Sequence, residues 1–357
     1  MALFKNLFGK KDKSKPPKGF SEIAILAIDR VTPEAVKIVL DATTDNFAFI
    51  PGQYLNFSIE LDGKEYRRSY SICSGTNTPL AVVVKQVENG TVSTWFNQTA
   101  EVGMKILVSK PEGNFIAPRD ARNIVAIAAG SGITPIMAIA KDCEESGKNL
   151  RLFYGNRSLE TTIFKNEIDA LQQTKCTHFL SDVPHENHEK GQITKEAFST
   201  IIKADLDLLK ADCFFICGPE QMIMNTAGVL ELFGVAKEKI KFELFTTPVL
   251  LKTEDKKDAT SDFKGKSKVT IILDDEEETF ELASTGISVL DKASKEGIDV
   301  PYSCKGGVCS TCKAKILKGE ATMTMNYSLT DKDIEEGYVL TCQAHPASDE
   351  LTISYDA

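Results

Sequence analysis

Apolar and polar residues alternate in short runs over the first third of the chain, and turn residues separate these runs. The clearest runs lie at residues 35–40, 54–59 and 81–85. Alternation with a period of two is typical of strands that bury one face and expose the other. We therefore expect an antiparallel β-barrel over residues 21–118.

Beyond residue 118 the period of the pattern changes. Residues 124–129 are entirely apolar, as expected for a parallel strand that is covered on both faces. Further apolar strands are expected at 150–154, 213–217 and 240–245, with helices starting near 135 and covering 164–173 and 220–233. Strands that alternate with helices predict a doubly wound α/β domain over residues 119–246.

The remaining residues divide into a linker and a third domain. Residues 247–266 are rich in Thr, Lys, Asp and Ser with few large apolar side chains, which indicates a linker. A C-terminal domain over residues 267–357 is expected to open with two strands, at 269–273 and 279–282, and a helix at 289–296.

The first 20 residues have a composition of their own. Six lysines stand against one aspartate, which favours a flexible basic tail over residues 1–20. A short apolar stripe in this tail leaves open a weak contact with a membrane surface or a partner; it consists of Leu3, Phe4, Leu7 and Phe8.

Composition and charge describe a soluble multidomain protein, since 42% of its 357 residues are hydrophobic and 26% are charged. The net charge of −9 comes from residues 267–357, where 17 acidic residues face 8 lysines. An acidic domain steers towards basic protein partners and argues against nucleic acid. Taken alone, the acidic run at 274–278 reads equally well as a solvated hairpin.

No transmembrane segment is expected. The longest uncharged run, residues 123–140, is short for a spanning helix and contains a Gly-Ser-Gly turn and a Thr-Pro pair. No secretory signal is recognised either, so nine cysteines are expected in a reducing, cytoplasmic setting.

Four cysteines follow the spacing C-x4-C-x2-C, and 29 further residues separate the third from the fourth; they are Cys304, Cys309, Cys312 and Cys342. This is the plant-type ferredoxin pattern, because two iron atoms bridged by sulfide need four thiolates. Gly306 and Gly307 let backbone N–H groups approach the sulfur atoms. The alternatives are a zinc site, which prefers paired C-x2-C modules, and ordinary free thiols.

Three short motifs lie in the expected barrel in the order Pro51-Gly52-Gln53-Tyr54, Arg68-Ser69-Tyr70-Ser71 and Gly90-Thr91-Val92-Ser93. A guanidinium suits a phosphate, an aromatic side chain suits a flat ring, and consecutive N–H groups suit a pyrophosphate. In this order the motifs resemble those of the ferredoxin–NADP reductase superfamily.

The resemblance implies bound FAD and gives each matching residue a role. Arg68 would bind the flavin pyrophosphate, Tyr70 would pack on the isoalloxazine ring, and Ser71 would lie near the reactive N5 atom. Tyr54 is expected near the flavin, and the pyrophosphate is expected to contact the third motif. The expected FAD residues are Tyr54, Arg68, Ser69, Tyr70, Ser71, Gly90, Val92 and Ser93.

A second cofactor region follows the apolar strand at 124–129. Glycines in Gly130-Ser131-Gly132 allow phosphates to approach the backbone where a helix begins. With Thr134 and Pro135 the segment resembles the superfamily's G-x-G-x-T-P turn, which implies nicotinamide nucleotide binding. After the strand at 213–217, Cys217-Gly218-Pro219 resembles the superfamily's nicotinamide pocket; as the alternative, Cys217 is a small buried apolar residue.

Two further positions concern catalysis and the choice of nucleotide. Glu243 and Phe245 resemble the superfamily's E-x-F ending close to the flavin, although the same residues also suit an ordinary strand. Together with Ser71 and Cys217, Glu243 completes the set of candidate catalytic residues. Arg157 and Ser158 follow a strand where relatives that use NADP often carry Arg and Ser for the 2′-phosphate. This favours NADPH and leaves NADH open.

The domain order, FAD barrel, NAD(P) domain and β-grasp ferredoxin domain, resembles the reductase components of multicomponent oxygenases, and most closely the phenylacetyl-CoA epoxidase reductase type. The implied activity passes electrons from NADPH through FAD and a [2Fe–2S] cluster to an oxygenase or another metalloprotein. A general NADH-dependent reductase that serves a desaturase or ring-hydroxylating system is the alternative. An electron-binding module without turnover and a zinc-stabilised interaction protein are hypotheses from other classes.

Overall fold

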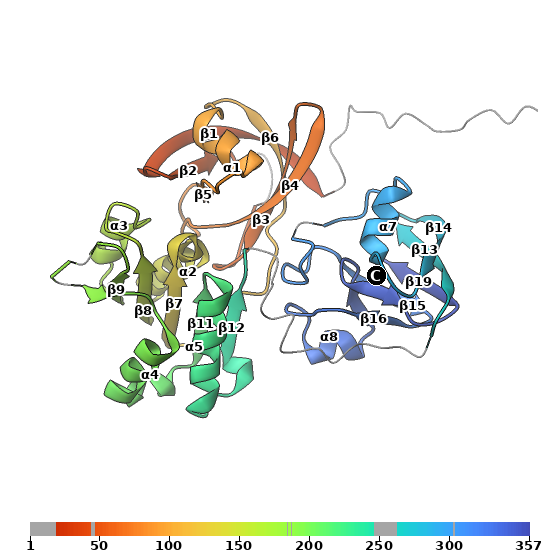
Figure 1. Ribbon diagram of the computed structural model, residues 1–357. Helices are drawn as coiled ribbons and strands as arrows, with labels where there is room; N and C mark the ends of the chain where they lie inside the picture. Colours follow the sequence, from red (N-terminus) through yellow and green to blue (C-terminus); the bar gives the residue numbers. More distant parts are fainter. Residues whose placement is uncertain (1–18, 44–46, 184, 187, 246–262, 303) are drawn as a thin grey trace, which may run out of the picture.

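The computed structural model describes residues 19–43, 47–183, 185–186, 188–245, 263–302 and 304–357, which form three domains (Figure 1). The predicted tail and linker lie almost entirely outside these residues. Strand β1 begins at Phe20 and strand β13 at Lys266, each the last residue of one of those predicted segments. The other domain boundaries stay predictions.

The first domain is the expected antiparallel β-barrel. Its strands lie in the order β4-β3-β6-β1-β2-β5, and a bridge between Ile72 and Val82 joins the two ends of the sheet. Alternating side chains such as Leu55, Phe57 and Ile38 fill its interior, as the period of two predicts. The strands are β1 (Phe20–Thr32), β2 (Ala35–Leu40), β3 (Tyr54–Leu61), β4 (Lys64–Ser71), β5 (Ala81–Lys85) and β6 (Lys105–Ser109), and helix α1 covers Thr91–Gln98.

The second domain is the expected doubly wound α/β domain, with a parallel sheet in the order β10-β9-β8-β7-β11-β12. Its strands are β7 (Asn123–Ala129), β8 (Asn149–Asn156), β9 (Thr174–Leu180), β10 (Glu189–Lys190), β11 (Cys213–Cys217) and β12 (Ile240–Glu243). Its helices are α2 (Ile133–Ser146), α3 (Lys165–Ala170), α4 (Lys195–Ala204) and α5 (Glu220–Leu232), with single 3-10 turns at Gly130–Gly132, Leu206–Lys210 and Lys237–Lys239.

Both faces of this sheet are covered, which explains the uninterrupted apolar run in β7. Ala126 and Ala128 pack in the core that contains α2 and α3, whereas Val125 and Ile127 pack in the core that contains α4 and α5. Successive strand residues point to opposite faces, so every position of such a strand must be apolar.

Some element expectations were wrong. The helix expected at 164–173 covers only Lys165–Ala170, because Leu171 is already extended and leads into β9. Neither β9 nor α4 was expected from the sequence. Helix α4 is amphipathic, but it buries only Phe198 and Ile202, a weak apolar signal. Residues 91–98 are helical within a region expected to hold only strands.

The third domain has the expected β-grasp arrangement, a mixed sheet in the order β14-β13-β19-β15-β17 with helix α7 packed on it through Val289, Leu290 and Ala293. The strands are β13 (Lys266–Leu273), β14 (Glu276–Ala283), β15 (Lys313–Lys318), β17 (Tyr338–Leu340) and β19 (Glu350–Ser354). A small second sheet pairs β16 (Ala321–Met323) with β18 (Ala344–Pro346), and the helices are α7 (Val289–Lys295) and α8 (Asp331–Glu335).

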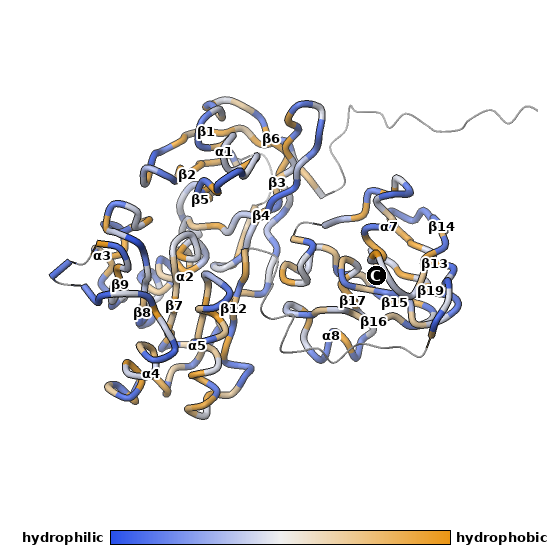
Figure 2. The backbone as a smooth tube through the Cα atoms, viewed as in Figure 1, coloured by the Kyte–Doolittle hydropathy of each residue, from blue (hydrophilic) through white to orange (hydrophobic). Residues whose placement is uncertain are grey.

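The ferredoxin-like domain lies beside both other domains (Figure 1). Val308 of its cysteine loop packs against the α/β core, and Phe242 of β12 meets Tyr327 with ring centroids 6.3 Å apart. Phe115, at the end of the barrel, contacts Phe215 of β11 with centroids 4.7 Å apart. Hydrophobic residues concentrate in the sheets of all three domains (Figure 2). In the described part of the chain, no helix is long and apolar enough to span a membrane.

Candidate functional site

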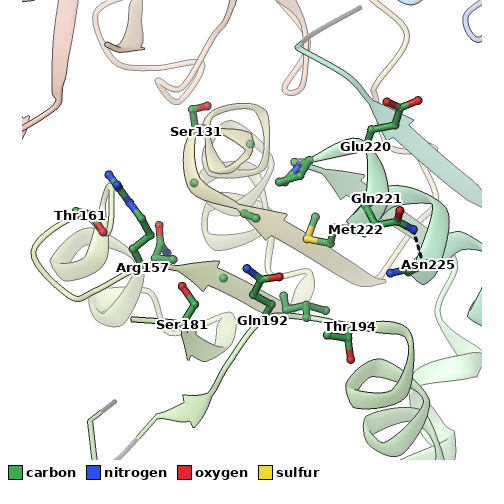
Figure 3. Close-up of a pocket in the computed structure, with 18 of the residues that line it drawn as sticks. Ser131, Arg157, Thr161, Ser181, Gln192, Thr194, Glu220, Gln221, Met222 and Asn225 are labelled. Carbon is green, nitrogen blue, oxygen red and sulfur yellow. Dashed lines mark hydrogen bonds between the residues drawn. The ribbon is translucent and has the colours of Figure 1, made fainter. Parts of the chain in front are cut away.

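A cavity of about 680 Å³ opens at the carboxyl ends of β7, β8 and β11 (Figure 3). In parallel sheets of this kind, ligands bind where neighbouring strands lead to helices on opposite faces. Six of the residues expected to bind the nucleotide line this cavity: Gly130, Ser131, Gly132, Arg157, Gly218 and Pro219. Phe245, which was expected near the flavin, lines it as well.

The two predicted glycine motifs pack directly on each other at the base of the cavity. A Cβ atom at Gly132 would lie 2.1 Å from the carbonyl oxygen of Cys217, so only glycine fits. The Thr134 hydroxyl donates to the Ser131 carbonyl at 3.0 Å and holds the turn before α2. This turn presents backbone groups to the cavity, which suits a pyrophosphate at the start of a helix.

Four expected nucleotide residues lie outside the lining: Thr134, Pro135, Ser158 and Cys217. Thr134 and Pro135 are buried in the turn and in α2, and the Ser158 hydroxyl lies 3.3 Å from that of Thr161. Cys217 is buried beneath the cavity, and burial raises the pKa of its thiol.

Sequence reasoning missed a larger set of lining residues that includes Lys85, Thr161, Ser181, Gln192, Thr194, Gln221 and Asn225. Ser181 and Gln192 follow β9 and β10, strands that were not expected, so their position at the carboxyl edge of the sheet could not be used. Lys85 comes from the barrel and has no motif around it. Only the packing of the two domains brings it to the cavity.

One end of the cavity carries opposite charges. Figure 3 places Arg157, Thr161 and Ser181 at this end, and Gln221 and Asn225 at the other. The Arg157 guanidinium donates to both carboxylate oxygens of Glu34, at 2.7 and 2.6 Å. This hydrogen bond holds the pKa of Glu34 below its usual value.

The three candidate catalytic residues converge where the barrel meets the α/β domain. The Ser71 hydroxyl at the end of β4 donates to the Glu243 carboxylate at 3.3 Å, and Glu243 of β12 pairs in register with Cys217 of β11. Burial raises the pKa of Glu243 to about 8. The structure therefore brings a hydroxyl, a carboxyl with a raised pKa and a buried thiol into one region.

The expected pyrophosphate residues surround the start of α1. No side chain caps this helix at Gly90, and its first turn holds no acid, so the N–H groups suit an anion. The Ser93 hydroxyl accepts from the Val87 N–H at 3.1 Å, while Val92 is buried in the barrel core. Arg68 on β4 is exposed, with one guanidinium nitrogen 2.7 Å from the Arg67 carbonyl.

The remaining expected FAD residues lie on strands β3 and β4. Tyr70 meets Phe57 edge to face with ring centroids 5.2 Å apart, and Ser69 donates to the Asn56 side chain at 2.7 Å. Tyr54 pairs with Ser71 across the two strands. An exposed guanidinium, a tyrosine and an uncapped helix start are the groups that FAD needs, so the residues present fit this cofactor.

The cysteine loop fits a [2Fe–2S] cluster. The Cys304 thiol hydrogen-bonds with Cys309, and the Cys312 thiol with Cys342, which gives two thiols for each of two iron atoms. Cys309 and the Gly306 N–H, 3.3 Å from the Cys304 sulfur, lower the pKa of Cys304 to about 6. Among the described residues, no group of three or more His, Cys, Asp and Glu could hold one metal ion.

The barrel contacts this cysteine loop directly, which the sequence did not predict. The Tyr54 hydroxyl donates to the Cys309 carbonyl and lies 3.2 Å from the Thr311 hydroxyl. Asn56 donates to Glu112 at 3.1 Å, and the same amide nitrogen lies 3.4 Å from the Thr311 hydroxyl. Tyr54, expected near the flavin, therefore reaches the loop that contains three of the four expected cluster cysteines.

A buried ion pair ties the same two domains together. Arg67 is 5% exposed, donates to Asp299 at 2.8 Å and to Glu65 at 2.7 Å, and lies over the Tyr302 ring at 5.4 Å. Its neighbour Arg68 carries the family resemblance, so nothing in the sequence distinguished Arg67 as an interface residue. A buried guanidinium with two carboxylate partners fixes a relative orientation well.

Comparison with protein families assigns a domain to each region of the chain. The matches are an oxidoreductase FAD-binding domain at residues 29–116, an oxidoreductase NAD-binding domain at 126–227 and a 2Fe-2S iron-sulfur cluster binding domain at 271–347. The order is the one expected from the sequence, and the three cofactor classes are confirmed.

Two curated relatives match over most of their length. A subunit of the 1,2-phenylacetyl-CoA epoxidase of Escherichia coli is 34% identical over 355 residues, which cover 95% of this chain and 98% of the relative. The ferredoxin reductase component of a 3-ketosteroid-9-alpha-monooxygenase from Mycobacterium tuberculosis is 30% identical, and the match covers 86% of each chain. Among solved structures, phthalate dioxygenase reductase shares the fold with a TM-score of 0.59 at 21% identity, covering 94% of this chain and 98% of that chain.

These matches define a class of flavin and iron–sulfur oxidoreductases built from three domains. The chain belongs to the family of oxygenase reductase components, which take electrons from a nicotinamide nucleotide and deliver them onward through FAD and a [2Fe–2S] cluster.

Proposed function

We propose that the chain oxidises NADPH and delivers single electrons to an oxygenase, and that the residues assigned above carry out this transfer. The observation that carries the proposal is that Tyr54 pairs with Ser71 on the flavin side and donates to Cys309 on the cluster side. When bound, FAD accepts a hydride and the cluster accepts electrons one at a time. The contact through Tyr54 supports a short path between the two groups.

The chain's own residues would orient the nicotinamide nucleotide and exchange a proton close to the flavin. The Gly130–Gly132 turn would hold the pyrophosphate, and Gly218 and Pro219 would place the nicotinamide next to Ser71. Glu243, whose pKa burial raises to about 8, would exchange a proton with the Ser71 hydroxyl at 3.3 Å. Burial of Cys217 beneath the ring position would exclude water from that side.

NADPH is proposed as the donor because Arg157 and Ser158 lie at the end of β8 and can meet a 2′-phosphate. One observation favours the NADH alternative, since Arg157 already donates to Glu34. The acceptor is proposed to be an oxygenase because the relatives named above are oxygenase reductase components. A cytoplasmic location is proposed because thiolates that bind a cluster need a reducing compartment.

Cys309→Ser tests the electron order. The variant should lose the cluster while retaining FAD, so NADPH-dependent reduction of ferricyanide should persist while reduction of a one-electron protein acceptor should disappear. Cys176→Ser is the matched control, because Cys176 is half-buried in the α/β domain and far in sequence from the cysteine loop. Wild-type rates with the protein acceptor in Cys309→Ser would contradict the proposed order.

A further inference from the structure

Glu34 reaches from the barrel to the edge of the nucleotide cavity, although it belongs to neither cofactor motif. It lies in the tight turn between β1 and β2. Its carbonyl oxygen accepts from the Gln86 N–H at 2.7 Å, and its own N–H donates to the Thr32 hydroxyl at 3.3 Å. The barrel therefore fixes the position of Glu34 without help from the α/β domain.

The Glu34 carboxylate faces two cations that line the cavity. Nη2 of Arg157 donates to both of its oxygens, at 2.7 and 2.6 Å, and Nζ of Lys85 lies 3.6 Å from Oε2. Both hydrogen bonds come from one guanidinium nitrogen, so the other two nitrogens of Arg157 do not bind Glu34. One carboxylate thus partly neutralises both cations that a nucleotide phosphate would approach.

The chemistry of the two nucleotides differs at this end of the cavity. A 2′-phosphate that binds Arg157 would lie close to the Glu34 carboxylate, and the two anions would repel each other. A ribose 2′-hydroxyl can instead donate to the carboxylate and leave the ion pair intact. Breaking the ion pair between Arg157 and Glu34 costs little free energy, because their side chains are 53% and 41% exposed.

We propose that Glu34 is a specificity-determining residue that opposes the 2′-phosphate and so limits the preference for NADPH that Arg157 and Ser158 give. The barrel thereby contributes to the selection between NADPH and NADH, together with the residues that follow β8 in the α/β domain. This inference rests on the proposed assignment of the cavity to the nicotinamide nucleotide.

Glu34→Gln in the full-length holoenzyme tests the proposal, with ferricyanide as acceptor. We expect the ratio of kcat/KM for NADPH to that for NADH to rise roughly three- to tenfold, mainly through a lower KM for NADPH. In an Arg157→Ala background the same change should leave the ratio within about twofold, because Arg157, which makes both hydrogen bonds to Glu34, is absent and Lys85 lies further away, at 3.6 Å. Glu22→Gln is the matched control, since Glu22 lies on β1 of the same barrel and pairs with Lys105 at 2.7 Å.

Other results would overturn the proposal. An equal change for both nucleotides would make Glu34 a contact between domains without a role in selection, and so would an unchanged ratio. If the kcat/KM ratio rose by the same factor in the Arg157→Ala background, the effect of Glu34 would not depend on Arg157. The proposed function fails in a different way, because then wild type and every variant would reduce ferricyanide with neither nucleotide.

Discussion

The nucleotide cavity and the cysteine loop differ in how far each site is open to solvent. The cavity is open, about 680 Å³ in volume, and lined by glycines and strand ends, with Phe245 at its edge 48% exposed. The cysteine site is more closed, with Cys312 only 3% and Cys342 only 8% exposed, and with Cys304 and Cys309 half-buried. It is also held against the barrel by Tyr54.

This difference follows from what each site must do. A nucleotide has to enter, react and leave, so its site uses backbone groups that are already in place and does not close on the ligand. A cluster has to stay bound and be shielded from solvent, so its site uses four thiols, three of them within one folded loop. The following predictions test whether the two regions are as independent as this contrast requires.

Gly132→Ala should have the largest effect, and only on the nucleotide side. The new Cβ would lie 2.1 Å from the Cys217 carbonyl oxygen, so the backbone at the base of the cavity must shift. Overpacking of this kind costs about 1–3 kcal/mol, which predicts a roughly 5- to 150-fold lower kcat/KM for both nucleotides. Steady-state kinetics measures this, and the iron content should stay at two per chain as for any [2Fe–2S] protein.

Gly228→Ala is the control for Gly132→Ala. Gly228 lies within α5, and no atom lies within 4 Å of a Cβ placed there. This variant should be neutral or gain about 0.5–1 kcal/mol of stability. Normal nucleotide kinetics in Gly132→Ala would show that the close approach of the two motifs is dispensable.

Gly307→Ala should have a smaller effect, confined to the cluster side. Gly307 has a φ of +75°, and a Cβ there would lie 3.1 Å from the Met325 carbonyl oxygen. A residue with a side chain in this conformation costs about 1–2 kcal/mol. We expect faster loss of the cluster, followed by its visible absorbance, with unchanged KM for the nucleotide.

Gly297→Ala separates general backbone strain from an effect on the cluster. Gly297 has a similar φ of +85°, but nothing lies within 4 Å of its Cβ position. The variant should lose similar stability and keep its cluster. If both variants lost the cluster equally fast, backbone strain anywhere in the third domain would be enough to release the cluster, and the contact of Gly307 with Met325 would not matter.

Tyr54→Phe should slow electron transfer between the two regions by a few-fold. The change removes one hydrogen bond to the Cys309 carbonyl, a contribution of about 1 kcal/mol. Rapid mixing with NADPH should show normal flavin reduction and slower cluster reduction. Tyr66→Phe is the control on β4, where the ring lies under Lys64. Equal cluster reduction in both variants would remove Tyr54 from the path.

Glu243→Gln should leave the contrast between the two regions intact and change how the stability of the protein depends on pH. Burial raises the pKa of Glu243 from its ordinary 4.5 to about 8, so the folded protein binds more protons than the unfolded chain between these values. The protonated Glu243 carboxyl therefore does not reduce the free energy of unfolding below pH 4.5. Its ionisation lowers this free energy progressively as the pH rises towards 8. The Tm of the nucleotide-free protein should fall less over this range in Glu243→Gln than in wild type.

The exposed Glu88 provides the control for this pH dependence. Glu88→Gln should follow the wild-type profile of Tm against pH. A Glu243→Gln profile parallel to wild type would mean that the carboxyl near Ser71 is not protonated at neutral pH, and its proposed proton-handling role would end.

Local patterns predicted much of the two regions. The spacing of the cysteines identifies the cluster because three ligands share one loop, so their geometry is encoded over nine residues. The turn at Gly130–Gly132 was also predictable, because a strand, a turn and a helix start are adjacent in the chain. The same holds for the barrel strands, where alternation directly reports which face is buried.

Residues whose role depends on a distant partner were not predictable. Lys85 and Glu34 enter the nucleotide region from the barrel, and Arg67 meets Asp299 across 232 positions of sequence. Ser71 and Glu243, 172 positions apart, were expected in one site only because each matched a known motif. No periodicity or spacing links such pairs.

The sequence by itself determined the three domains, and it predicted the four cysteines as cluster ligands and the turns for FAD and nucleotide, because each depends on a short segment with its own physical signature. Only the tertiary structure decided which barrel residues face the nucleotide and the cluster. Those contacts depend on how the domains pack, and packing unites side chains according to shape and charge rather than sequence separation. The pairing of Glu34 with Arg157 arises in this way, and with it the proposed choice between the two nucleotides.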